Sequence, residues 1–138
     1  LVVQWQQTAE DNRADLSYAH LSNANLIYAD LTGANLSNAD LGGANLHDAD
    51  LTNADLTGAF LYDADLSYAD LGGANLHDAD LSYADLFDAD LTGANLSNAD
   101  LTGADLYDTE LTGVNWDWAI CPDGTAAYYH GQTCVNNL

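Results

Sequence analysis

Three kinds of residue in this chain could do chemistry: four histidines, 22 acidic residues and two cysteines. His47 and His77 each stand in a His-Asp-Ala-Asp segment, and imidazole beside carboxylate can bind a metal ion or move a proton. The sequence nevertheless contains no Cys–His or Ser–His–Asp arrangement, no His-Glu-x-x-His motif and no glycine-rich phosphate loop. We therefore expect no enzyme, no catalytic residue, no metal site and no cofactor.

The elements that must position these residues follow from a repeat of five. Leucine occupies every fifth position from Leu16 to Leu111, and alanine keeps the same step two residues earlier, from Ala14 to Ala104. The residue between them is almost always Asp or Asn. A period of five fits neither the 3.6 of a helix nor the 2 of a strand. Repetition of this length predicts one small unit stacked many times around a regular apolar core.

The charge balance excludes several classes of partner. Arg13 is the only strong base among 138 residues, and the formal net charge is −21. Nucleic acids and anionic membranes are recognised through Lys and Arg, so we expect neither as a partner. No apolar run approaches the roughly 18 residues of a membrane span, and no membrane insertion is expected. A basic protein surface is the natural charged partner.

The two cysteines lie outside the repeat. Cys121 and Cys134 fit no Cys-x-x-Cys redox or zinc pattern. A disulfide between them would stabilise the chain by roughly 3 kcal/mol on the loop-entropy model. We predict this disulfide, which would imply an oxidising compartment.

The chain divides into three segments. Residues 1–13 lack the repeat phase and are expected to form an N-terminal cap. Residues 14–118 form the repeat array, and residues 119–138 change in composition and are expected to form a C-terminal cap. Caps are needed because a stack of coils has open backbone edges and an apolar floor at each end. Three residues are expected to seal the last coil: Trp116, Trp118 and Ile120.

The Ala-[Asp/Asn]-Leu-x-x units resemble the pentapeptide-repeat family, over about three quarters of the chain. The resemblance implies an all-β fold, a right-handed quadrilateral parallel β-helix (solenoid) with four faces and twenty residues in each coil. Ala and Leu would point inward, in about five coils. The tail also resembles the disulfide-closed ends of some exported cyanobacterial members. That likeness implies export to the periplasm or thylakoid lumen, with the cytoplasm as the alternative.

Residues twenty apart would share a face, so outward residues fall into columns. One column is an uninterrupted acidic ladder: Asp30, Asp50, Asp70, Asp90 and Glu110. It could be a solvated face, a docking site for a basic protein or a weak cation site. Calcium needs six or more converging oxygens, whereas a flat ladder spreads them. Stacked like charges repel, so we expect the fold to tolerate the ladder rather than gain from it.

Aromatic residues form a second outward column. Four of them make a possible contact stripe: Tyr28, Tyr68, Phe87 and Tyr107. A neighbouring column adds Phe60, which replaces the usual Asp or Asn, with Tyr62 and Tyr83. The stripe could reflect cross-strand packing or contact with a protein partner. His47 and His77 would lie on opposite faces and could not share a metal ion.

Three functional hypotheses remain open. The first is a non-catalytic scaffold or protein-binding rod of unknown biological role, monomeric rather than dimeric, with an unknown and possibly basic protein partner. The second is DNA mimicry, because some members of the family bind DNA gyrase and duplex DNA carries about one charge per 1.7 Å. The chain lacks the inserted loops and long C-terminal helix of those members. The third is a spacer whose faces bind nothing specific.

Overall fold

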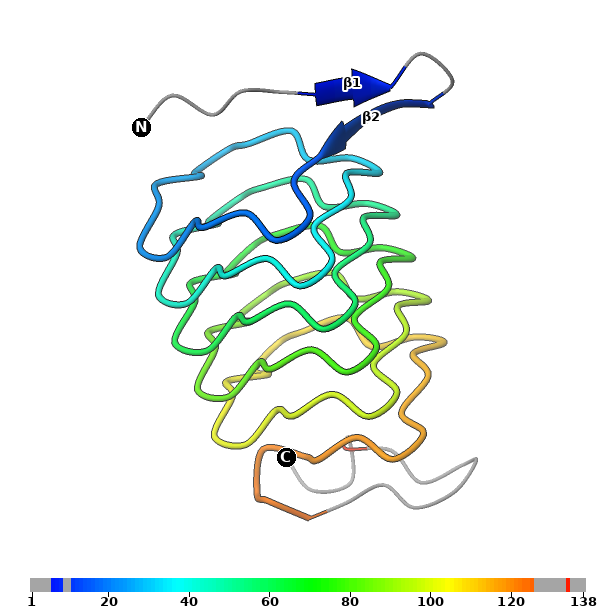
Figure 1. Cartoon of the computed structure of the whole chain (residues 1–138). Coiled ribbons are helices and arrows are strands. Elements are labelled where there is room, and N and C mark those ends of the chain that lie inside the picture. Colours follow the sequence, from blue (N-terminus) through cyan, green and yellow to red (C-terminus); the bar gives the residue numbers. More distant parts are fainter. Residues whose placement is uncertain (1–5, 9–10, 126–133, 135–138) are drawn as a thin grey trace.

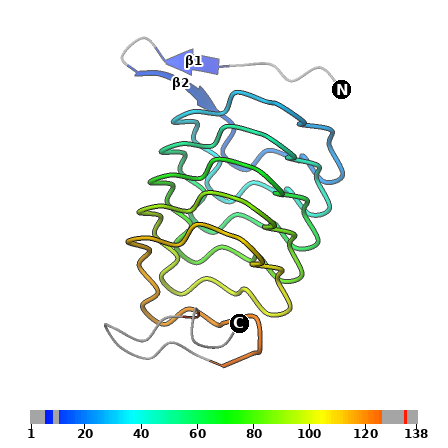
Figure 2. The same ribbon diagram turned by 180° about the vertical axis from the view of Figure 1, so that it is seen from behind.

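The protein is a stack of coils, described for residues 6–8, 11–125 and 134 of the computed structural model (Figure 1). Two short antiparallel strands, β1 (Gln6–Thr8) and β2 (Asp11–Asp15), lie at the N-terminal end of the stack. The view from behind shows the chain advancing coil by coil to the opposite end (Figure 2). Within the described part of the chain, no helix is long and apolar enough to cross a membrane.

Parallel bridges hold the coils together at intervals of twenty residues. They run from Asp15–Asn35 to Asp100–Ile120, and each bridging residue stands one position before a core residue. A hydrogen-bonded turn follows every core leucine, as when the Ala19 N–H donates to the Leu16 carbonyl (3.0 Å). Four turns therefore bring the chain back over itself in each twenty-residue coil.

The core is the column of leucines and alanines that the repeat predicts. Leucines from 36 to 101 are at most 1% exposed, and alanines from 34 to 99 are at most 2% exposed. Each buried leucine contributes roughly 1.5–3 kcal/mol. Leu26 and Leu111, towards the two ends of the stack, are only partly buried. Burial is therefore most complete in the middle coils, where each layer has another on both sides.

At the C-terminal end, the three residues expected to seal the last coil differ in exposure. Trp116 takes a leucine position and is buried, and Ile120 is partly buried. Trp118 is 52% exposed because it is the third residue of a turn, where the side chain leaves the coil. The predicted disulfide joins Cys121 to Cys134, with the Cα atoms 5.2 Å apart. Residues 1–5, 9–10, 126–133 and 135–138 of the two expected caps lie outside the described residues.

In the middle coils, a repeat with Asp or Asn before its leucine has an acceptor for all five of its backbone N–H groups. In residues 54–58, the N–H of Ala54 closes the preceding turn, and those of Asp55, Leu56 and Gly58 donate to carbonyls of neighbouring coils. The N–H of Thr57 donates instead to the side-chain oxygen of Asp55 (3.0 Å). This is an Asx turn, in which a side chain accepts from the backbone two residues later. Asp or Asn before the leucine therefore completes the backbone hydrogen bonding of the unit.

The Asx turn recurs in 19 of the 21 units between Asp15 and Asn115, counting Glu110 with the Asp and Asn residues. The two exceptions have His20 and Phe60 at the acceptor position. The acidic ladder thus has a structural role that the sequence analysis did not predict, although its stacked charges still repel one another. Each ladder residue accepts a backbone N–H that no carbonyl accepts, which offsets repulsion between the stacked charges.

The third residue of every turn from 18 to 118 is left-handed, with φ between +55° and +73°. Glycine, asparagine and aspartate fill most of these positions, as expected from their low cost in this region. The remaining five are aromatic and exposed: Tyr18, Tyr28, Tyr68, Tyr83 and Trp118. A bulky residue here costs about 1 kcal/mol, so the fold alone does not favour these aromatic choices.

Candidate protein-contact surface

A continuous stack of rings crosses four successive coils on one face. His47 meets Tyr68 edge-on with ring centroids 5.3 Å apart, and Tyr68 meets Phe87 edge-on at 5.4 Å. Phe87 and Tyr107 are nearly parallel at 5.9 Å. Three members of the predicted stripe are thus brought together, and His47, not among the predicted contact residues, extends them. The signal in the sequence was the spacing, because His47, Phe87 and Tyr107 are separated by multiples of twenty residues, the length of one coil.

Tyr28, the fourth predicted member, stands apart. It is 73% exposed and makes no ring contact with any residue that the structure describes. Two members of the stack also keep large exposed surfaces, with Tyr68 at 47% and Tyr107 at 67%. The rings therefore pack on one another, as one interpretation of the stripe predicted, and still leave aromatic surface open to a partner.

Acidic residues surround the C-terminal part of this stack. They come from three positions: before the leucine on the same face, at the adjoining corner, and on the acidic ladder of the next face. We call the set the acidic–aromatic surface, and it comprises Tyr68, Phe87 and Tyr107 with Asp65, Asp70, Asp85, Asp88, Asp90, Asp105, Asp108 and Glu110.

Hydrogen bonds favour the ionised form of the ladder residue Asp50. The Thr52 hydroxyl, the Thr52 N–H and the Thr32 hydroxyl lower the pKa of this carboxyl, and slight burial opposes them. The N–H contact measures 2.9 Å. The other ladder residues accept the same backbone bond at 2.7–3.2 Å. The ladder is thus a row of carboxylates held in fixed orientations by their own turns.

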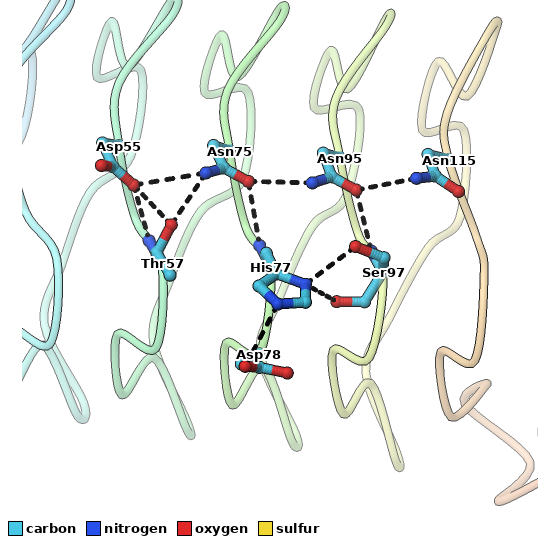
Figure 3. Close-up of polar contacts among 8 residues, drawn as sticks. All are labelled: Asp55, Thr57, Asn75, His77, Asp78, Asn95, Ser97 and Asn115. Atoms are coloured by element: carbon cyan, nitrogen blue, oxygen red, sulfur yellow. Dashed lines mark hydrogen bonds and ion pairs between the residues drawn. The ribbon is translucent and has the colours of Figure 1, made fainter.

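Contrary to the expectation from the sequence, the structure does bring Ser, His and Asp side chains together. His77 Nδ1 lies 2.9 Å from Ser97 Oγ and 3.0 Å from the Ser97 carbonyl oxygen, and His77 Nε2 lies 3.3 Å from Asp78 (Figure 3). A carbonyl only accepts, so Nδ1 must carry its proton to make that bond. An Nδ1 that donates cannot take a proton from the serine, so this trio does not activate a nucleophile.

A second trio of Ser, His and Asp lies on the opposite face, and its histidine Nδ1 is also a hydrogen-bond donor. Ser67 Oγ donates to Asp65 at 2.5 Å, so His47 Nδ1, 2.8 Å away, must donate to Ser67 Oγ. His47 Nε2 lies 3.2 Å from Asp48. Both histidines therefore link one coil to the next. Among the described residues, no group of three His, Cys, Asp or Glu side chains could hold a metal ion.

Asparagine side chains form a ladder beside His77 (Figure 3). The Asn115 amide donates to Asn95 and the Asn95 amide to Asn75, both at 3.0 Å. The Asn75 amide donates to Thr57 Oγ1 at 2.8 Å. Stacked amides of this kind stabilise repeating β structures. This face is therefore occupied by internal hydrogen bonds, which leaves the acidic–aromatic surface as the better contact candidate.

Comparisons with known proteins agree with this architecture. A search of curated proteins found no match. Among solved structures, the pentapeptide repeat protein Rfr23 of the cyanobacterium Cyanothece 51142 is 47% identical, with a TM-score of 0.64. The match covers 64% of this chain and 60% of that protein, so this chain spans less than two thirds of its relative.

Two further structures extend the likeness. A pentapeptide repeat protein from the Arabidopsis thaliana thylakoid lumen is 32% identical over 90% of this chain and 89% of its own, with a TM-score of 0.52. QnrB1, a plasmid-mediated fluoroquinolone resistance protein, is 23% identical over 76% of this chain and 64% of its own, with a TM-score of 0.50, and shares the fold.

These relatives imply that the stack is a right-handed β-helix. The family model described as "Pentapeptide repeats" matches eight copies, over residues 12–43, 44–82 and 79–115. These matches span most of the chain and coincide with the turns, bridges and buried leucines of the stack. The chain therefore belongs to the pentapeptide repeat family.

Proposed function

We propose that this protein is a non-catalytic, protein-binding rod and that its acidic–aromatic surface contacts a basic protein. The observation that carries the proposal is the ring stack, because Tyr68 and Tyr107 stay 47% and 67% exposed. Exposed aromatic side chains supply much of the energy at protein interfaces, where surrounding contacts exclude water. Eight carboxylates border these rings, and they would attract a surface rich in Lys and Arg and speed the encounter.

Capture from a cell extract, with a double variant and a matched control, tests the proposal. Phe87→Thr with Tyr107→Thr removes two of the three rings of this surface and keeps every charge, and Tyr83→Asn removes an exposed ring on another face. We expect basic proteins that bind the wild type to be lost with the double variant and retained with Tyr83→Asn. Equal capture by all three proteins would reject this surface and favour a spacer.

DNA mimicry is the second candidate, and charge density favours it. Residues 61–110 contain 12 acidic residues. At about 4.8 Å per coil, this stretch of two and a half coils is about 12 Å long. It carries about one charge per ångström of rod, compared with about one per 1.7 Å in duplex DNA. Salt-sensitive inhibition of DNA gyrase supercoiling at micromolar protein would support mimicry, and no inhibition would leave the protein-binding rod.

We also propose an oxidising, exported location, in the periplasm or the thylakoid lumen. The disulfide between Cys121 and Cys134 and the lumenal origin of the Arabidopsis relative support it. The segments 1–13 and 119–138 would then act as the two caps of a monomeric rod. Free thiols in protein isolated from its native source would argue for the cytoplasm instead.

A further inference from the structure

An open groove of about 520 Å³ lies at another corner of the rod. This corner follows the Leu16 column, ten residues or half a coil from the corner of the acidic–aromatic surface. Six residues line it: Tyr18, His20, Asn38, Asp40, Phe60 and Tyr62. The groove thus combines three aromatic side chains with a carboxylate, and none of the residues lining it is Lys or Arg.

Tyr18, Phe60 and Tyr62 form the aromatic walls of the groove, and the first two depart from the residue pattern of the repeat. Tyr18 is left-handed, with φ 58°, and 71% exposed, and Phe60 is 49% exposed in a position normally held by Asp or Asn. The Tyr62 ring covers the backbone of Gly42, where a Cβ would come within 2.3 Å of it. Residues that cost local stability and remain exposed are often kept for function.

The same corner holds both units that lack an Asx acceptor. His20 and Phe60 occupy the acceptor positions, and the N–H groups of Ser22 and Tyr62 donate to no acceptor among the described residues. Every other unit from Asp15 to Asn115 satisfies this N–H with its own side chain. Of Ser22 and Tyr62, only Tyr62 lines the groove, so its N–H is the backbone donor left for a carbonyl group of an incoming chain.

Asp40 is held in place at the groove. Ser22 Oγ donates to its Oδ2 at 2.6 Å, and the Gly42 N–H donates to its Oδ1 at 3.2 Å. These two bonds and nearby His20 lower the pKa of the carboxyl. At neutral pH the groove thus presents a fixed carboxylate with lone pairs left for a cation.

We propose that this groove binds the arginine side chain of a basic peptide segment from a partner protein. The guanidinium packs against the faces of the aromatic walls and donates to Asp40, while the Tyr62 N–H donates to a carbonyl of the segment. Arginine fits because its planar, weakly hydrated cation stacks on aromatic rings and forms bidentate hydrogen bonds with a carboxylate. The volume is within the range of ligand sites and accommodates flanking backbone as well as the side chain.

No Lys or Arg within these 138 residues is placed to occupy the groove. Arg13 is the only Lys or Arg in the chain, and its side chain lies over Gly33 at a different corner, 3.6 Å from where a Cβ would stand. A rod of net charge −21 attracts basic segments, and the aromatic walls give one site on it selectivity beyond charge. This site shares no residue with the acidic–aromatic surface and does not depend on the function proposed for it.

The test is an NMR titration of the full chain in 150 mM NaCl with acetyl-Gly-Arg-Gly-amide. The neutral control is the same peptide with citrulline, which keeps the shape of arginine and lacks its charge. We expect saturable shifts of the Tyr18, Asp40 and Tyr62 amides with the arginine peptide and at least tenfold weaker binding of the citrulline peptide. Equal binding of both peptides, or shifts spread evenly over all acidic faces, would overturn the proposal.

Two variants distinguish binding of the peptide by the aromatic walls from its general attraction to a negatively charged protein. Phe60→Asn and Phe60→Asp both restore the acceptor of the repeat, so both should fold, and the second adds a negative charge. We expect each to weaken binding at least fivefold, and Tyr107→Thr on the acidic–aromatic surface to leave it unchanged. Unchanged or tighter binding by Phe60→Asp would show that charge alone attracts the peptide and would reject the groove.

Discussion

The Asp or Asn that precedes most leucines accepts a backbone N–H, and this structural role does not depend on charge. Four N–H groups of a unit find carbonyls, and the fifth depends on this side chain. A buried or half-buried donor left without a partner costs more than an average hydrogen bond gains. Asp and Asn both supply the acceptor oxygen of this bond, and Asn does so without a charge.

Asp70 provides a direct test, because its turn bond goes to the backbone N–H of a glycine, Gly72, at 2.9 Å. We expect Asp70→Ala to lower the free energy of unfolding by about 1 kcal/mol, the value of one such bond. Asp70→Asn keeps the acceptor and removes one ladder charge, so it should be neutral or stabilising. Urea denaturation of the three proteins measures the effect, and equal losses for both variants would show that charge, not the turn bond, is what matters.

The pKa of Asp50 is a second test at the residue scale. It lies below the ordinary value of 3.8 because Thr52 and Thr32 bond the ionised form. A lowered pKa in the folded state stabilises the protein above the unfolded-state pKa, and this contribution is lost as pH falls through the folded-state pKa. We expect the ¹³C NMR titration of Asp50 to have its midpoint below 3.8 and to move upward in Thr52→Val. A Thr112→Val control should leave the midpoint in place.

At the scale of the turn, side chains of one coil cover glycines of the next. The Tyr83 ring lies where a Cβ on Gly103 would come within 2.6 Å, whereas a Cβ on Gly93 would meet nothing within 4 Å. Both glycines are left-handed, with φ of +71° and +69°. The pair therefore separates the conformational cost of alanine from the cost of displacing an aromatic side chain.

We expect Gly93→Ala to lower the free energy of unfolding by roughly 1 kcal/mol, the cost of a left-handed alanine. Gly103→Ala should lose about 0.5 kcal/mol more, because it also displaces the Tyr83 ring from its packing. In a Tyr83→Ala background the extra loss should vanish. Thermal or urea unfolding gives these differences, and identical losses at the two glycines would show that Tyr83 contributes nothing to the turn.

The turn also shows where prediction from sequence succeeds and fails. The leucine and alanine columns predict the buried core, because they are the apolar residues that recur at fixed phases of the repeat. The ring stack follows in part from the register of twenty. The role of Asp55 could not be predicted, because it depends on which backbone N–H of the turn lacks a carbonyl. The groove was missed because Tyr18 and Phe60 belong to different columns that meet only across a corner.

At the scale of the whole molecule, repulsion between like charges opposes the packing and hydrogen bonds that hold the coils together. The chain carries −21 on a rod of 138 residues, so repulsion acts along every face. Added salt screens this repulsion, and we expect the thermal midpoint to rise between 10 and 500 mM NaCl. A variant with Asp65, Asp85 and Asp105 changed to Asn should respond less, because it keeps the turn acceptors and loses three charges. A flat response in the wild type would contradict this account.

The disulfide should act locally at the end of the rod. The Cys121 N–H donates to Thr125 at 2.7 Å, and the Ile120 N–H donates to Ala99 at 2.9 Å. On reduction we expect faster hydrogen exchange at Cys121 first and little change at Leu56 in the middle of the stack. Loss of protection at Leu56 would instead show that the linked end holds the whole stack together. A Cys121→Ser, Cys134→Ser variant should be insensitive to reductant.

The Asx turn makes charge an adjustable quantity at constant fold. Of its 19 acceptors, 13 are acidic and six are Asn, in residues 15–115. Exchanging all 13 for amides would take the net charge from −21 to −8 without removing one acceptor of a backbone N–H. The ratio of Asp to Asn at these positions thus sets the surface potential without changing the fold. Evolution or a designer can set it face by face, choosing which neighbours the rod attracts or repels while the coils beneath remain the same.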